Sequence, residues 1–149
     1  RGPLSHLRGR WRFKTRYSAN GWHELSRDCW EALTVRDWTA IRERYLRDKL
    51  AVRLGGLAAD LARVSSFSRN PVNREVVNGL LDESKLFIEW TAGEAEVDAA
   101  AQLVELQVQL ALWQLDWDRI WADPGQRAQV AEQSRVWSGR ILDLSGLLS

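Results

Sequence analysis

The residues best suited to bind a charged partner lie close together near the N-terminus. Residues 10–17 read Arg-Trp-Arg-Phe-Lys-Thr-Arg-Tyr, so basic residues alternate with aromatic residues or threonine. In an extended chain this alternation places the bases on one side and most of the rings on the other. Guanidinium groups suit phosphates, and aromatic rings can stack on unpaired bases. We therefore expect this segment to bind nucleic acid through Arg8, Arg10, Trp11, Arg12, Phe13, Lys14, Arg16 and Tyr17.

Charge is distributed unevenly along the 149 residues. Residues 1–81 contain 16 Lys or Arg against 8 Asp or Glu, whereas residues 82–149 contain 5 against 12. This division indicates either a polyanionic partner or two halves that attract each other when the chain folds. The alternative for the N-terminal segment is accordingly a structural strap, in which the rings pack and the charges are solvated.

The ionisable residues form no recognisable catalytic or metal-binding pattern. Cys29 falls on the apolar side of an expected helix, roughly opposite His23, so these two residues would not meet as nucleophile and base. Neither the Glu-x-x-His pairs of di-iron bundles nor a glycine-rich phosphate loop occurs. We expect a non-enzymatic protein without a cofactor. No apolar run approaches the roughly 18 residues of a membrane span, and a cytoplasmic location is expected.

Proline, glycine and capping residues divide the remaining chain into five expected helices. Asn70 and Asp123 each precede a proline and are suited to cap a helix. Gly93 is expected to adopt a left-handed conformation between two helices. The expected helices span residues 22–33, 35–66, 71–91, 94–122 and 124–147.

The helix expected at residues 35–66 has two apolar faces. Trp38, Ile41 and Tyr45 lie on one side, whereas Leu54 and Leu61 lie nearly opposite. We expect the first half to pack against the helix at 22–33 and the second half to enter a bundle. The Gly-Gly pair at residues 55–56 indicates a bend or a close approach between helices. Arginines in the first half could contact phosphates in a helix-turn-helix, but intervening acids favour a solvated surface.

The helix expected at residues 94–122 is apolar on most of its sides. Its first set of apolar residues has the four-then-three spacing of a heptad seam: Ala99, Leu103, Leu106, Leu110, Trp113, Trp117 and Ile120. A second set covers much of the other side: Val104, Val108, Ala111, Leu112 and Leu115. Such a helix lies either in the middle of a bundle or at a dimer interface, and we expect a homodimer.

The expected fold is all-α. Residues 22–149 are predicted to form a four-helix bundle with an additional short N-terminal helix, and residues 1–21 an extended basic aromatic arm. The favoured function is non-enzymatic nucleic-acid binding through the arm. The alternative is a protein–protein adaptor or assembly factor that recognises a partner, such as an acidic protein, through aromatic helix faces.

Overall fold

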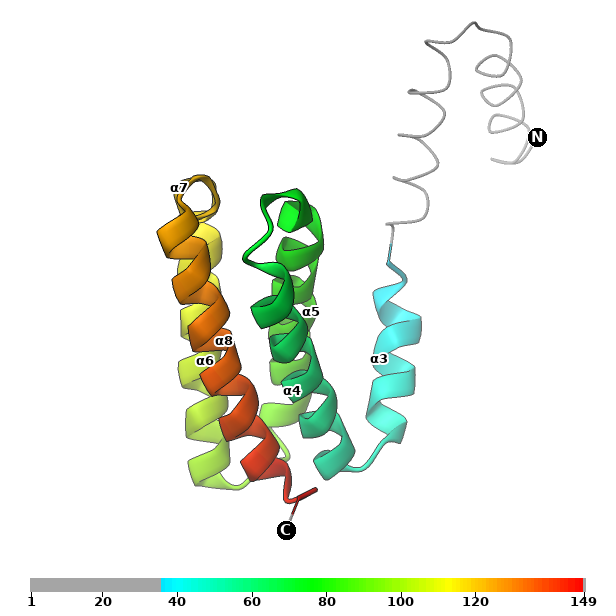
Figure 1. Ribbon diagram of the computed structural model, residues 1–149. Coiled ribbons are helices and arrows are strands. Elements are labelled where there is room, and N and C mark those ends of the chain that lie inside the picture. Colours follow the sequence, from blue (N-terminus) through cyan, green and yellow to red (C-terminus); the bar gives the residue numbers. More distant parts are fainter. Residues whose placement is uncertain (1–35, 149) are drawn as a thin grey trace, which may run out of the picture. The chain divides into compact units, whose positions relative to one another are not determined.

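A computed structural model describes residues 36–148, and every regular element among them is helical (Figure 1). The all-α prediction is thus confirmed for this part of the chain, while the arm and the helix expected at 22–33 lie outside it. None of the described helices is long and apolar enough to cross a membrane. The elements are α3 (Trp38–Arg47), α4 (Leu50–Phe67), the 3-10 turn η1 (Pro71–Asn73), α5 (Arg74–Ala92), α6 (Val97–Leu115), α7 (Trp117–Ala122) and α8 (Pro124–Ser145).

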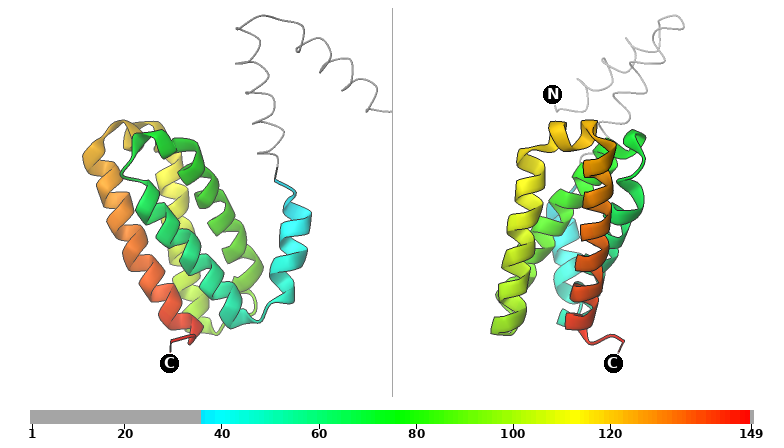
Figure 2. Two further views of the ribbon diagram at one scale, coloured as in Figure 1. Left: turned by 45° about the vertical axis from the view of Figure 1, so that its right-hand side comes forward. Right: turned by 60° about the vertical axis from the view of Figure 1, so that its left-hand side comes forward.

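The chain divides between residues 41 and 42, and the core of the described part lies in the unit that begins at Arg42. Four long helices, α4, α5, α6 and α8, run side by side, and successive ones are antiparallel (Figures 1 and 2). Helix α4 packs most extensively against α8 and α5, and α6 packs mainly against α5. Their apolar seams meet in the interior, where the largest fully buried side chains are Leu57, Leu61, Leu81, Leu103, Leu106, Leu110 and Ile141.

The helix expected at residues 35–66 is two helices, and its prediction as one continuous element is wrong. Helix α3 ends at Arg47, and Lys49 has an extended backbone (φ −63°, ψ 153°) before α4 begins. The physical reason is the pair of opposite apolar faces. A straight helix could not direct both Tyr45 and Leu54 into one core, whereas a reversal at Asp48–Lys49 buries both. Tyr45 therefore packs against α5, whereas the expected partner was the helix at 22–33.

Of the two glycines of α4, Gly55 marks a close approach, but its neighbour is the turn after α8 and not another helix as predicted. Helix α4 continues through Gly55 and Gly56 without a break. A Cβ on Gly55 would lie 2.7 Å from Leu147 Cδ1 at the C-terminal end of the chain. Glycine at this position thus lets the end of the chain lie against α4.

The helix expected at residues 94–122 is also divided. Helix α6 ends at Leu115, Asp116 leaves the helical conformation (φ −114°, ψ 28°), and α7 follows. The heptad spacing continues through this bend, so periodicity alone could not reveal it. The bend lets the Trp121 indole N–H donate to the carbonyl oxygen of Pro71 at 2.8 Å. The Arg127 guanidinium in turn donates to the carbonyl oxygen of Trp121, in the last turn of α7.

Of the three residues predicted to mark helix ends, the two N-caps are confirmed and the left-handed glycine is not. The side chains of Asn70 and Asp123 accept backbone hydrogen bonds from Val72 and Gly125, respectively, so both act as N-caps. Gly93 is right-handed (φ −68°), contrary to the prediction. The connection from α5 to α6 closes through right-handed turns and needs no left-handed residue there. Gly146, after α8, is left-handed (φ 68°).

Candidate interaction surface

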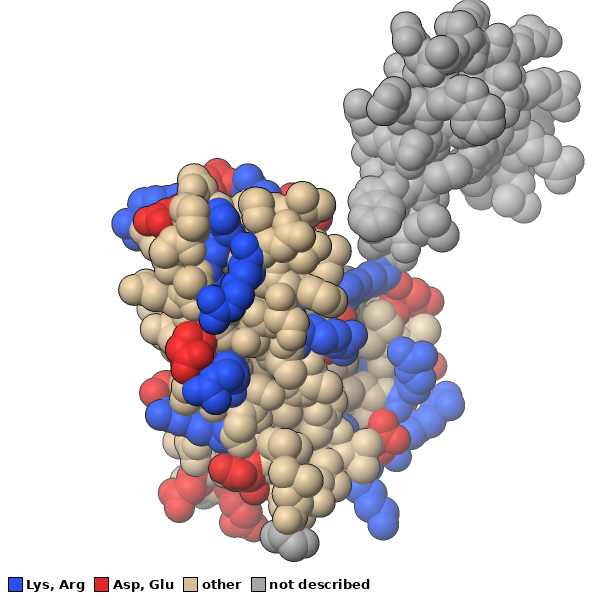
Figure 3. Space-filling model, in the orientation of Figure 1, with Lys and Arg blue, Asp and Glu red and all other residues tan. Residues whose placement is uncertain are grey.

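The residues predicted to bind nucleic acid, at positions 8–17, lie outside the described part of the chain. The arginines that follow them in sequence are described. Arg42, Arg44 and Arg47 are exposed on α3, and Figure 3 shows basic side chains gathered there. Glu43 and Asp48 are exposed among them, so the basic surface of α3 is diluted by acids.

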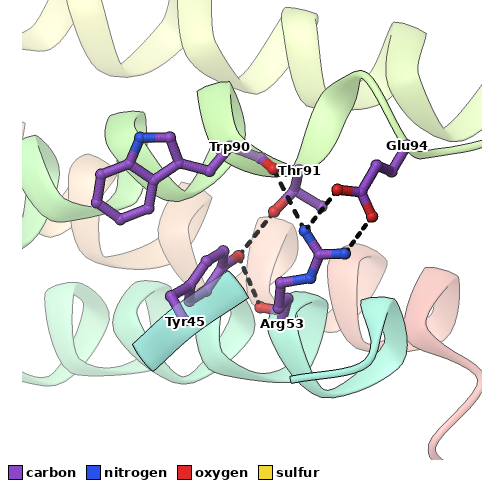
Figure 4. Close-up of polar contacts among 5 residues, drawn as sticks. All are labelled: Tyr45, Arg53, Trp90, Thr91 and Glu94. Atoms are coloured by element: carbon purple, nitrogen blue, oxygen red, sulfur yellow. Dashed lines mark hydrogen bonds and ion pairs between the residues drawn. The ribbon is translucent and has the colours of Figure 1, made fainter. Parts of the chain in front are cut away.

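A buried polar cluster joins the end of α3 to α4 and α5 (Figure 4). The Tyr45 hydroxyl donates to the carbonyl oxygen of Arg53 at 3.1 Å and lies 2.8 Å from the Thr91 hydroxyl oxygen. The Tyr45 ring stacks on Phe87 with 4.1 Å between centroids and 15° between planes. Burial raises the pKa of Tyr45 to about 12, and the hydrogen bond from Thr91 opposes this only in part.

The second half of the cluster is a buried arginine. The side chain of Arg53 is 5% exposed, donates to the carbonyl oxygen of Trp90 at 3.3 Å and forms an ion pair with Glu94. Hydrogen bonding to Arg53, together with its positive charge, lowers the pKa of Glu94. A buried guanidinium without a partner would be costly, and these bonds offset much of that cost.

The polar cluster is suited to holding helices together and unsuited to proton transfer. A general acid or base works best with a pKa near the operating pH. The pKa values of Tyr45 and Glu94 are moved away from neutrality, the first upward and the second downward. Among residues 36–148, no group of three or more His, Cys, Asp or Glu could hold a metal ion.

Of the described helices, α6 carries the most extensive exposed apolar surface. We define the outer face of α6 by seven exposed residues: Val97, Ala101, Val104, Val108, Ala111, Leu112 and Leu115. Val97 and Leu115, at its ends, are 82% and 85% exposed, and the larger side chains between them are about half exposed. On a helix of 3.6 residues per turn this face lies opposite the buried Leu106.

The position of α6 explains why this face is uncovered. Helix α6 lies at an edge of the four long helices in the right-hand view of Figure 2. Its buried seam turns toward the core, and two glutamines beside that seam bond to α5. Gln107 donates to Glu89 at 3.3 Å, and Gln114 donates to Asp82 at 2.9 Å. No other element among residues 36–148 packs on the opposite side of α6.

Sequence reasoning identified most of the outer face and missed its N-terminal end. Val97 and Ala101 extend the face by almost two turns and continue its four-then-three spacing, which was the signal that could have found them. The partners of Arg53 were also missed, because Trp90 and Glu94 lie 37 and 41 residues away in sequence.

No protein-family model matches this chain, and neither does any curated protein or solved structure.

Proposed function

We propose that this chain is a non-enzymatic interaction module. In this proposal α4, α5, α6 and α8 act as a four-helix bundle that presents the outer face of α6 to another protein. One observation carries the proposal: seven exposed apolar residues form one face along a whole helix, and six of them follow heptad spacing. Contiguous exposed apolar surfaces with such spacing are typical of helix-to-helix interfaces.

The fold of residues 42–148 does not itself require this apolar surface. The buried seam of α6 already contributes Leu103, Leu106, Leu110 and Trp113 to the core. Polar residues at the seven outward positions would leave that core unchanged and would suit solvent better. Apolar residues there therefore support a role in contact with a partner.

Site-specific photo-crosslinking in the cells that make the protein tests this proposal. A photo-crosslinking amino acid replaces Val104 in the outer face or, as a matched control, Val72, which is 85% exposed on η1. We expect protein adducts from position 104 that resist nuclease and are destroyed by protease, and none above background from position 72. Equal yields from both positions, or no protein adduct at position 104, would refute the proposal.

Nucleic-acid binding through residues 1–21 is the second candidate. It is favoured by the excess of bases in residues 1–81 and by the exposed arginines of α3. In this proposal the bases of the arm contact phosphates and its rings stack on unpaired bases. The single cysteine suits a reducing compartment, so we place the protein in the cytoplasm.

A salt titration with single- and double-stranded oligonucleotides tests the second candidate. Deletion of residues 1–17 should abolish binding. Replacing four bases should flatten the slope of log affinity against log salt by up to about 4, close to one unit per lost phosphate contact. These bases are Arg10, Arg12, Lys14 and Arg16. No binding of the intact protein at low salt would exclude this candidate.

A further inference from the structure

We infer that the partner of the outer face of α6 is a second copy of this chain, bound through the same face. This inference rests on the proposed function and names its partner. Two properties of the outer face support a second copy, the spacing of its residues and its area, and the charges beside it determine how the association depends on salt.

The spacing of the outer face allows it to pair with itself. Its residues step by 4, 3, 4, 3 and 4 from Val97 to Leu115, which is the a/d pattern of a coiled coil, and Leu112 widens the face on one side. A two-fold dimer places the same surface patch of each copy against the other, so the patch must be complementary to itself. A seam of Val, Ala and Leu without an interruption by charge meets this requirement.

The area of the face is sufficient for a specific dimer. Each copy contributes seven side chains, and the larger ones are half or more exposed. Together the two copies would bury on the order of 1,000 Å² of accessible surface. That value is at the lower end for specific interfaces and predicts a dimer that dissociates on dilution. The alanines at positions 101 and 111 permit close approach of the two helices.

The charges beside the face give the dimer an unusual salt dependence. Helix α6 contains Asp98 and Glu105 and no Lys or Arg, so two facing copies bring acids toward acids. Salt screens this repulsion between exposed charges. Self-association should therefore strengthen as salt is added, opposite to the weakening expected for a complex with nucleic acid.

Sedimentation velocity across a dilution series tests the inference on the full-length chain. The variant Val104→Glu/Val108→Glu places four carboxylates in the proposed interface and should raise the dissociation constant by about 100-fold or more. The matched control is Val52→Glu/Val72→Glu, which alters two exposed valines outside α6 and should leave the dissociation constant unchanged. Far-ultraviolet circular dichroism should show equal helix content in all three proteins.

Chemical cross-linking gives a second readout that does not depend on the charged variant. In a Cys29→Ala background, a short bismaleimide should link two chains carrying Val104→Cys and should not link chains carrying Val72→Cys. We also expect the dissociation constant to fall by a few-fold between about 50 and 500 mM salt. Equal weakening by both double-glutamate variants, or equal linking at positions 104 and 72, would overturn the inference.

The two proposals fail in different ways. If the protein is a monomer at the highest attainable concentration but position 104 forms protein adducts in cells, the inference of a second copy is overturned and the proposal of an interaction module stands. A monomer combined with no adduct overturns both.

Discussion

Replacing Tyr45 by Phe removes one hydroxyl from the polar cluster and retains the aromatic ring. The ring would still stack on Phe87, whose centroid lies 4.1 Å away. The variant loses the bond to the carbonyl of Arg53 and leaves the buried Thr91 hydroxyl without its phenol partner. A net loss of about 1–2 kcal/mol in the free energy of unfolding is expected near neutral pH.

The same substitution should change the pH dependence of stability. Burial raises the pKa of Tyr45 to about 12 in the folded protein, against about 10 in the unfolded chain. Below pH 10 the phenol is neutral in both states, so its full contribution is present. Between pH 10 and 12 only the unfolded chain ionises, and the wild-type protein loses about 1.4 kcal/mol per pH unit. Phenylalanine cannot ionise, so the variant loses nothing through this position.

The two effects have opposite signs and should cross near pH 11. Below pH 10 the wild-type protein is more stable than Tyr45→Phe, and near pH 12 it is less stable. Urea denaturation at several pH values from 8 to 12, followed by circular dichroism, measures the difference directly. The second tyrosine, Tyr17, is present in both proteins and cancels in the comparison. A difference that stays constant over this range would mean that the phenol ionises equally in the folded and unfolded states, and the burial argument would fail.

Three further substitutions test the packing of the core and the close approach at α4. Trp117 is 8% exposed, and its ring centroid lies 5.0 Å from that of Trp121. Replacing Trp117 by Ala should lower the free energy of unfolding by roughly 3–5 kcal/mol. A loss below about 1 kcal/mol in chemical denaturation would contradict the burial of Trp117. Gly139→Ala should raise stability by roughly 0.5–1 kcal/mol, because a Cβ there meets nothing within 4 Å. Gly55→Ala should raise it less, because Leu147 must move, and equal thermal midpoints for the two variants would argue against the close approach.

Much of the fold could be predicted from short-range patterns. The seam residues Leu103, Leu106 and Leu110 are buried as predicted, because a 3.6-residue repeat places them on one side of a helix whatever lies around it. The caps at Asn70 and Asp123 form as predicted, because each bond spans only two residues. These interactions are local, so the sequence alone determines them.

The ends of the helices could be predicted less well. The last helix was expected to run to residue 147, whereas α8 ends at Ser145, where Gly146 turns the chain in a left-handed conformation and leaves Leu148 76% exposed. The bend at Asp116 leaves the apolar spacing intact. Periodicity states which residues face the core, and it does not state where a helix must end so that the chain can turn.

Only the tertiary structure decided which residues meet across the chain and which apolar surface remains uncovered. Tyr45 and Thr91 are 46 residues apart, and no sequence spacing relates them. Helix α6 has apolar residues on both its buried and its exposed side, so its composition could not distinguish the two. The number and placement of the neighbouring helices made that distinction: α5 and the core cover the side of Leu106, and Val104 and Val108 on the opposite side are left exposed.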